Sequence, residues 1–276
     1  MRVGVNWTSP HNADLIKRLV DTGEVDFCEL LIDNFLIYEP EVLLEALPTK
    51  ACAFHIMNSH FLHRELGELK DYAKRIRVFA KVLNPIYVSD HVGVFAHNGK
   101  QLPFMMEVVY DNFSSVFSQK VKQWAELLEC TVFYENFPSY EIQRPTQVEF
   151  FRRIQGDLSP CLNILFDVSN AILAEKNGCE ALLLWHDIAE KTPHLHLGSY
   201  RKAGKTSYYL DSHDRAVPQE GLIFLQTIDL SQKTIVVERD YNLNFEAWSQ
   251  DIGRVRHLLQ RNSSDIYAEI NTRRSA

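Results

Sequence analysis

The chain has 276 residues, of which 46% are hydrophobic and 24% charged. This balance is typical of a globular protein that buries a sizeable core, and it excludes an intrinsically disordered chain. The formal net charge of −7 argues against a protein whose main task is to neutralise phosphates, so no nucleic-acid partner is expected.

Neither a secretory signal nor a membrane span is evident in the sequence. The first residues, MRVGVNWTSP, lack a long apolar stretch behind a basic segment, and no run approaches the roughly 18 apolar residues of a membrane helix. We therefore expect a cytoplasmic protein with no membrane partner. Five scattered cysteines without a C-x-x-C pair favour neither a disulfide framework nor a thiolate zinc site.

Short apolar runs alternate along the chain with longer stretches of helical periodicity, which is typical of βα units around a parallel sheet. The expected strands are Arg2–Trp7, Phe27–Ile32, Ala51–Ile56, Pro85–His91, Thr131–Asn136, Leu162–Asp167, His194–Gly198 and Thr234–Asp240. The expected helices include Asp14–Thr22, Glu68–Leu83, Glu107–Glu129, Thr146–Gln155, Glu180–Lys191 and Phe245–Gln260. Arg201, Lys202 and Lys205 are expected in a solvated loop.

Eight such units predict an α/β fold, a single (β/α)₈ TIM barrel. We expect the barrel to span residues 1–262 and residues 263–276 to form a flexible C-terminal tail. Nothing between these limits resembles a linker or an internal repeat, so one metal-binding domain is predicted.

Most of the later predicted strands end, or nearly end, in a residue type that binds metal. The C-terminal strand ends of a βα barrel converge on one cavity, so these side chains are expected to meet. They are His55, His91, Glu135, Asp167, His196 and Glu238, joined by Asp211 and His213 in the sequence LDSHDR.

Carboxylates and imidazoles buried together would cost many kcal/mol without compensation, because like charges repel and each ion loses its water. Metal cations supply that compensation. Imidazole nitrogens and carboxylate oxygens suit iron, zinc and manganese, and a carboxylate such as Glu135 can bridge two ions. The set contains no thiolate, which disfavours a structural zinc.

Each of these residues also has a simpler interpretation. A single histidine in a strand, such as His55 or His194, is more often a hydrogen-bonded core residue than a ligand. Glu135 or Glu238 could form a buried ion pair with an arginine such as Arg239 or Arg153. The recurrence of eight ligand types at the same end of successive units favours metal.

Two further residues are placed by the alternation of strand side chains. His194 shares a face with His196 but lies one layer deeper, where it could support the ligand. Asp240 lies nearer the rim than Glu238, where a general base or a substrate contact would sit. Glu135 and Asp240 are therefore the candidate catalytic residues.

Several motifs together carry a resemblance to a known family. They are SDH at 89–91, ENFPSY at 135–140, FDVSN at 166–170, HLHLG at 194–198, DSH at 211–213 and ERD at 238–240. With them the chain resembles the multinuclear non-heme iron-dependent oxidative enzymes. This branch of the xylose-isomerase-like barrels includes the oxidase that matures methanobactin. The resemblance extends from about residue 2 to residue 260.

The resemblance implies two or three iron ions per chain, with zinc or manganese as alternatives. One iron would be held by His55, His91 and Glu135. A second would be held by Glu135, Asp167, His196 and Glu238, and a third by Asp211, His213 and Asn170. Barrels of the endonuclease IV type have a histidine where this chain has Asn170. An amide oxygen is a weaker ligand than imidazole, so the third site should be the most labile.

The reaction implied is iron-dependent activation of O₂ for oxidation of a side chain, usually cysteine, in a ribosomally made precursor peptide. A partner protein that presents the peptide is also implied. The alternatives are a metal-dependent phosphodiesterase, a sugar isomerase or epimerase, and a non-catalytic peptide-binding barrel. A phosphodiesterase would need a basic groove for DNA, and an isomerase would not need His55 and His91.

Overall fold

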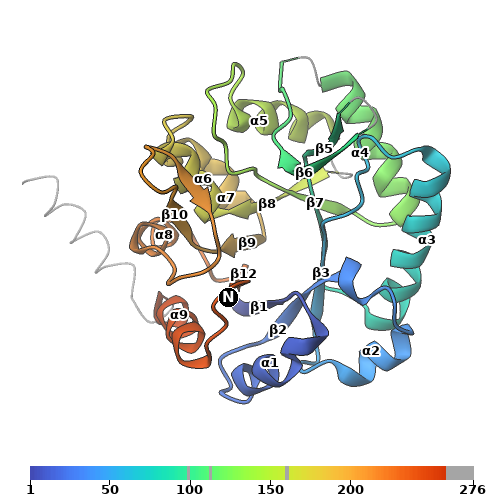
Figure 1. The fold of residues 1–276 in the computed structure, drawn as a ribbon, viewed down its shortest axis with the longest axis vertical. Helices are drawn as coiled ribbons and strands as arrows, with labels where there is room; N and C mark the ends of the chain where they lie inside the picture. The colour runs from blue at the N-terminus through green and yellow to red at the C-terminus, as the bar shows by residue number, and fades with distance from the viewer. Residues whose placement is uncertain (98–99, 112–113, 159–161, 259–276) are drawn as a thin grey trace, which may run out of the picture.

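A closed barrel of parallel strands forms the centre of the computed structural model, which describes residues 1–97, 100–111, 114–158 and 162–258 (Figure 1). Its eight strands follow one another around the barrel in the order β1-β12-β9-β8-β7-β4-β3-β2, and β2 pairs with β1 to close it. They are β1 (Arg2–Trp7), β2 (Phe27–Leu31), β3 (Cys52–Ile56), β4 (Val88–His91), β7 (Val132–Glu135), β8 (Leu162–Asp167), β9 (His194–Leu197) and β12 (Thr234–Val237). The predicted TIM barrel is confirmed.

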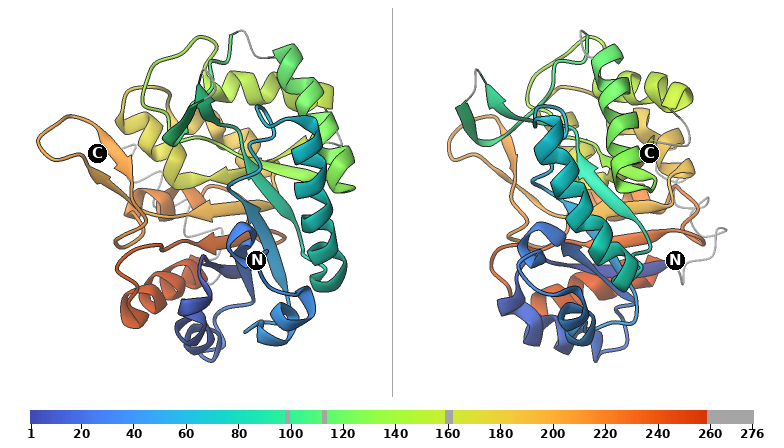
Figure 2. Two further views of the ribbon diagram at one scale, coloured as in Figure 1. Left: turned by 45° about the vertical axis from the view of Figure 1, so that its right-hand side comes forward. Right: turned by 90° about the vertical axis from the view of Figure 1, so that its right-hand side faces the viewer.

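Helices surround the strands as an outer ring (Figures 1 and 2). They are α1 (Ala13–Val20), α2 (Pro40–Ala46), α3 (Leu66–Leu83), α4 (Ser114–Leu128), α5 (Gln147–Leu158), α6 (Val168–Lys176), α7 (His186–Lys191), α8 (Gln219–Leu225) and α9 (Phe245–His257). Short 3₁₀ turns occupy η1 (Pro10–Asn12), η2 (Ile32–Phe35) and η3 (Leu182–Trp185).

The apolar character of the barrel strands follows from their burial on both faces. After its exposed first residue, every residue of β1 is buried, and β3 is buried throughout. A strand covered by helices outside and by core side chains inside has no solvent face, so it reads as a continuous apolar run. The helices instead bury one stripe: α3 packs Leu69, Ala73 and Ile76 against the barrel and ends at left-handed Asn84.

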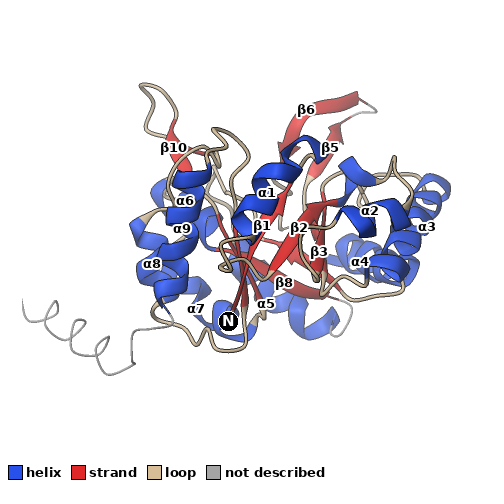
Figure 3. Cartoon of the chain, turned by 90° about the horizontal axis from the view of Figure 1, so that it is seen from below, coloured by secondary structure: helices blue, strands red, loops and turns tan. Residues whose placement is uncertain are grey.

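Two antiparallel hairpins of the described chain were not expected from the sequence. One is β5 (Val94–His97) with β6 (Lys100–Met106), and the other is β10 (Tyr200–Lys202) with β11 (Tyr209–Asp211). Both rise from the same end of the barrel, the end at which β4 and β9 finish (Figure 3). Arg201 and Lys202 therefore lie on a strand rather than in the predicted loop, although both are exposed as expected.

The predicted helix Glu107–Glu129 is wrong in its first part. Residues 107–111 are not helical, and α4 begins at Ser114. The side-chain amide of Gln143 accepts a hydrogen bond from the Tyr110 N–H (3.2 Å) and donates one to the Val108 carbonyl (3.0 Å). These bonds satisfy the backbone outside a helix, so the apolar spacing of this segment reflects core packing rather than helical structure.

Helix α6 was also missed, because it starts directly where β8 ends. The Asp167 carboxylate accepts a hydrogen bond from the Asn170 N–H (2.8 Å) and so caps the first turn. The predicted tail, residues 263–276, lies outside the described residues.

Candidate metal centre

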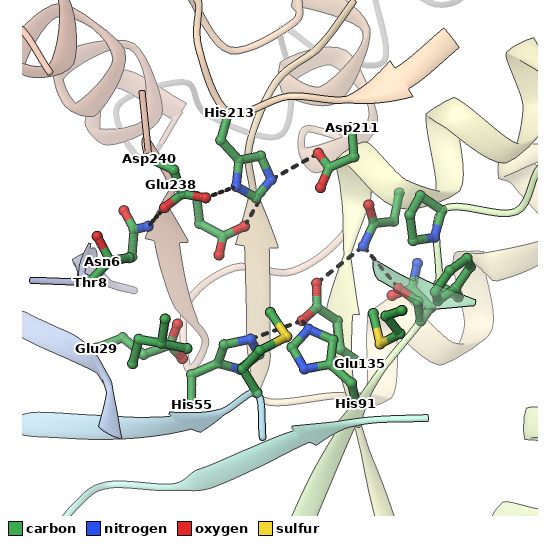
Figure 4. Close-up of a pocket in the computed structure, with 17 residues that line it drawn as sticks. Asn6, Thr8, Glu29, His55, His91, Glu135, Asp211, His213, Glu238 and Asp240 are labelled. Atoms are coloured by element: carbon green, nitrogen blue, oxygen red, sulfur yellow. Dashed lines mark hydrogen bonds and ion pairs between the residues drawn. The ribbon is translucent and has the colours of Figure 1, made fainter. Parts of the chain in front are cut away.

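Side chains from all eight barrel strands, or from the segments that follow them, meet in one cavity at the C-terminal end of the barrel (Figure 4). On one side, His55 is the last residue but one of β3, whereas His91 ends β4 and Glu135 ends β7. Glu135 Oε2 lies 3.4 Å from His55 Nε2 and 3.2 Å from His91 Nε2. All three side chains are almost completely buried, and they form the first group whose geometry could hold a metal ion. The sequence predicted this group.

The second group lies deeper in the barrel and shares Glu135. Ligand atoms of Glu135, Asp167, His196 and Glu238 all lie within 4.8 Å of one another. His196 Nδ1 is 3.1 Å from Glu238 Oε1 and 3.8 Å from Glu135 Oε1. Because β9 lies between β8 and β12 in the barrel, His196 sits between Asp167 and Glu238. The structure therefore brings together all four predicted residues.

The third group consists of Asp211 at the end of β11, His213 in the loop that follows, and Glu238 directly after β12. His213 Nε2 lies 3.0 Å from Asp211 Oδ1 and 3.7 Å from Glu238 Oε2. Figure 4 shows His213 across the cavity from His55 and His91. His213 has a positive φ of 43°, which is uncommon for a residue other than glycine, and its side chain lines the cavity.

Asn170 and Asp240, the other two predicted residues, also line the cavity. The Asn170 amide donates hydrogen bonds to Glu135 Oε1 (3.1 Å) and to the Asn136 carbonyl (2.9 Å). Asp240 accepts hydrogen bonds from His213 Nδ1 (2.9 Å) and from the Asn6 amide (2.7 Å). Asn170 thus contacts the carboxylate of the first two groups, and Asp240 orients the histidine of the third.

The hydrogen-bond partners of three cavity histidines indicate which ring nitrogen carries the proton. A carbonyl or carboxylate only accepts, so His91 Nδ1 donates to the Ile56 carbonyl (3.1 Å) and His213 Nδ1 donates to Asp240. The Ser89 hydroxyl donates to the Phe54 carbonyl (3.2 Å) and so accepts from His55 Nδ1 (2.8 Å). In the neutral form of all three rings the lone pair is then on Nε2, which faces the cavity. Metal-binding histidines are held in this way.

Several buried polar atoms in the cavity have no hydrogen-bond partner among the described residues. They are Asp167 Oδ2, Asn170 Oδ1, His196 Nδ1, His213 Nε2 and Glu238 Oε2. A buried polar atom without a partner is costly, and native proteins rarely keep several together. Every one of these atoms belongs to a predicted ligand, and each carries a lone pair suited to a cation. The residues present therefore fit a cluster of metal ions.

The electrostatics of the cavity reflect its burial and the closeness of its carboxylates. Burial and the neighbouring Glu135 carboxylate raise the pKa of Asp167 well above its usual range, and burial raises the pKa of Glu238. Burial lowers the pKa of His55 to about 4. At His91 burial lowers the pKa, but the contacts with Glu135, Asp90 and the Ile56 carbonyl together outweigh it and raise the pKa to about 9. Bound cations would relieve the repulsion among the carboxylates.

Glu29, on β2, was missed in the sequence. Its carboxylate is buried and lies 2.9 Å from His196 Nε2, and it also accepts a hydrogen bond from the Tyr87 hydroxyl. Glu29 lies inside the apolar run FCELL rather than at its end, so the strand-end pattern did not include it. An acidic residue within a strand buried on both faces was the available signal.

The simpler interpretations of two site residues can also be assessed. Arg239 forms its ion pair with Asp251 (2.8 Å), so its charge is directed away from Glu238. His194 packs its ring 4.1 Å from that of Tyr87 and contacts the Thr234 hydroxyl (2.9 Å), one layer below His196 as predicted.

Among the described residues, the candidate metal groups contain no cysteine. No helix in the described part of the chain is long and apolar enough to cross a membrane.

Comparison with known proteins identifies a matching family. The sequence model of the family described as RiPP precursor modification enzyme MbnB/TglH/ChrH matches residues 2–260. RiPPs are ribosomally made peptides that are modified after translation. A relative, the UPF0276 protein of Rhizorhabdus wittichii, is 27% identical over 232 residues, which cover 78% of each chain.

Solved structures share the fold at low sequence identity. A xylose isomerase-like TIM barrel protein from Mycobacterium smegmatis in complex with magnesium is 11% identical, with a TM-score of 0.60 over 92% of this chain and 89% of that one. A xylose isomerase domain protein from Planctomyces limnophilus is 15% identical, with a TM-score of 0.56 over 94% and 95%. These similarities show a xylose-isomerase-like barrel.

Proposed function

Because the chain belongs to the MbnB/TglH/ChrH family of RiPP precursor modification enzymes, we propose that it is a multinuclear non-heme iron-dependent oxidase acting on such a precursor peptide. The side chain that it oxidises is a cysteine, and O₂ is the oxidant. The observation that carries this proposal is the arrangement of buried, unpaired ligand atoms around Glu135 and Glu238.

The proposal includes three ion sites. His55, His91 and Glu135 would hold one ion, and Glu135, Asp167, His196 and Glu238 a second. Asp211 and His213 would hold the third with Asn170. Imidazole and carboxylate ligands suit iron, although zinc and manganese accept the same donors. Bound iron would supply the one-electron chemistry that allows O₂ to react with a thiol.

The chain's own residues would bind and orient the peptide at the mouth of the cavity. Apolar side chains form part of the wall there, including Leu31, Met57, Met105 and Phe137. The hairpins β5–β6 and β10–β11 rise around the same end of the barrel (Figures 2 and 3). An apolar wall beside polar ligands would receive a cysteine side chain and exclude bulk water.

The proposal also includes a partner protein that presents the peptide and a cytoplasmic location.

The proposal is tested first by the metal content of protein purified anaerobically without added metal. Elemental analysis and Mössbauer spectroscopy should find two or more irons per chain in mixed ferrous and ferric states. Zinc or manganese alone would contradict the oxidase.

Variants at the first ion site test the assignment of ligands. His91→Ala and Glu135→Ala should lose iron and activity together, because each removes a ligand of that site. His257→Ala, on the exposed side of α9, is the matched control and should keep the iron content of the wild type. Full iron content in both cavity variants would refute the assignment.

A further inference from the structure

The floor of the cavity contains a pair of buried side chains to which the proposed function assigns no role. We propose that Glu29, held by Tyr87, is a positioning residue that keeps the proton of His196 on Nε2, so that Nδ1 is the metal-binding atom. This inference rests on the proposed function, because it requires a metal in the cavity.

The contacts of Glu29 leave little freedom for the His196 ring. His196 Nε2 lies 2.9 Å from Glu29 Oε1 and 3.1 Å from Glu29 Oε2, and both residues are at most 1% exposed. A carboxylate this close accepts the Nε2–H bond and stabilises the tautomer that carries it. The opposite nitrogen, Nδ1, has no hydrogen-bond partner among the described residues and points toward Glu238 and Glu135.

This orientation is the reverse of that found at the other cavity histidines. His55, His91 and His213 each anchor Nδ1 and present Nε2 to the cavity. His196 lies deepest, with no exposed surface, and its ring extends across the barrel toward β2. Because the His196 ring has this direction, its Nε2–H group is buried below the cavity. This N–H group therefore needs a hydrogen-bond acceptor on β2, and Glu29 supplies it.

Tyr87 holds Glu29 in turn. Its hydroxyl donates to Glu29 Oε2, and its ring packs against those of His194 (4.1 Å between centroids), Phe133 (6.1 Å) and Phe27 (6.4 Å). Phe27 can lie there because its strand neighbour is glycine: a Cβ on Gly4 would be 2.5 Å from the Phe27 ring. The aromatic floor of the barrel thus keeps the carboxylate under His196.

A different role for Glu29 is conceivable from distance alone, since Glu29, His55 and His196 lie close enough together to hold an ion. The hydrogen bonds favour positioning. Glu29 Oε1 accepts from His196, and Oε2 accepts from both Tyr87 and His196. A carboxylate that already accepts these bonds is better placed to orient a ligand than to replace one.

The first experiment needs no variant. Long-range ¹H–¹⁵N NMR of histidine-labelled wild-type protein distinguishes Nδ1 from Nε2 in each ring. In the metal-free chain and after addition of Zn²⁺ alone, His196 should keep its proton on Nε2. Binding of Zn²⁺ should change the ¹⁵N chemical shift of Nδ1 in His196. In His55 and His91 it should instead change the chemical shift of Nε2.

The second experiment measures Zn²⁺ and anaerobic Fe²⁺ affinity in three variants. Glu29→Ala should weaken binding at the site of His196 by about 10- to 100-fold, the usual effect of removing a group that orients a ligand. Glu29→Gln keeps an acceptor oxygen and should restore most of that affinity. Tyr87→Phe leaves Glu29 in place and should give a smaller loss.

Glu180→Ala is the matched control. Glu180 is also a buried carboxylate, bonded to the Trp185 indole (2.9 Å) and to the Val148 N–H (3.2 Å), and it is not among the residues lining the cavity. Its removal should leave metal affinity unchanged. Circular dichroism should show that all the variants fold.

The outcomes separate this inference from the proposed function. Zn²⁺ bound through Nε2 of His196, or wild-type affinity in Glu29→Ala, would overturn the positioning role while leaving the metal centre intact. Loss of a whole equivalent of metal in Glu29→Gln would show that Glu29 is a ligand and would overturn the role as well. A wild-type chain that binds neither ion would overturn both.

Discussion

At the scale of single residues, each cavity side chain is held by a group behind it. Asp240 holds His213, the Ile56 carbonyl holds His91, and Asn170 bonds Glu135. Such contacts reduce the conformational entropy lost when a ligand binds, because the side chains are already oriented. Small residues also help to orient the cavity side chains, because an imidazole ring can occupy its position only if the neighbouring residue leaves space for it.

Gly198, directly after β9, provides such space. A Cβ at this position would lie 2.5 Å from Cδ2 and Nε2 of His213, so Gly198→Ala should displace that ring. We expect the variant to lose about one metal ion per chain and to keep the others. Elemental analysis measures the loss, with Gly67→Ala as the control because nothing lies within 4 Å of its Cβ. Unchanged metal content in Gly198→Ala would contradict the placement of His213.

Glu107 tests the electrostatics of a partly buried carboxylate away from the cavity. Burial raises its pKa to about 7, although the Ser139 and Tyr110 hydroxyls donate to it. A raised pKa in the folded state means that the carboxyl favours folding below its unfolded pKa and that this contribution is lost as the pH rises through 7.

Glu107→Gln should therefore become more stable relative to the wild type between pH 5 and pH 8, by about 2 kcal/mol, since each pKa unit corresponds to about 1.4 kcal/mol. The amide oxygen can still accept from both hydroxyls. Urea unfolding of both proteins at the two pH values measures the difference. An equal difference at pH 5 and pH 8 would refute the raised pKa.

At the scale of elements, a buried ion pair joins the segment directly after β12 to the middle of α9. Arg239 and Asp251 are 4% and 2% exposed, and Asp251 also accepts a hydrogen bond from the Val217 N–H (3.2 Å). This contact turns Arg239 outward, while Glu238 and Asp240 on either side of it face the cavity. The position of two site carboxylates therefore depends on a helix on the outside of the barrel.

Asp251→Ala should destabilise the protein by about 3–5 kcal/mol, because it leaves the Arg239 charge buried without a partner. The double variant Asp251→Leu with Arg239→Met removes both charges and should recover most of this loss. Chemical denaturation measures both. A loss below about 1 kcal/mol in the single variant would show that Arg239 reaches solvent.

At the scale of the whole molecule, the core and the metal centre are separate layers. The core consists of apolar side chains inside the barrel and between strands and helices, and it includes Trp7, Trp124, Trp185 and Trp248. The ligands lie above it, at the strand ends. Burial of such a core is the dominant favourable contribution to folding and does not require a metal.

Removal of metal by a chelator should therefore leave the barrel folded, unlike a zinc finger. Far-ultraviolet circular dichroism should be unchanged. The melting temperature should fall, because bound metal stabilises only the native state. Loss of the circular dichroism signal at 25 °C after chelation would show that the carboxylates cannot be accommodated without cations.

Much of the fold and of the candidate site could be predicted from the sequence. The positions of the barrel strands follow from their burial on both faces, which leaves short, mostly apolar runs such as that of β8. The ligands His55, His91, Glu135 and Asp167 could be recognised because they interrupt or end such runs at the same edge. These are local patterns, and local patterns can be recognised from the amino-acid sequence alone.

Only the tertiary structure decided the rest. The hairpins β5–β6 and β10–β11 are short and partly exposed, so their sequences carry little periodicity. Residues 107–111 have a helical pattern, but Gln143 bonds their backbone in another conformation. Glu29 meets His196 across 167 residues of chain, and no spacing encodes a contact at that separation. Sequence periodicity determines which face of an element is buried, whereas barrel closure determines which buried groups meet.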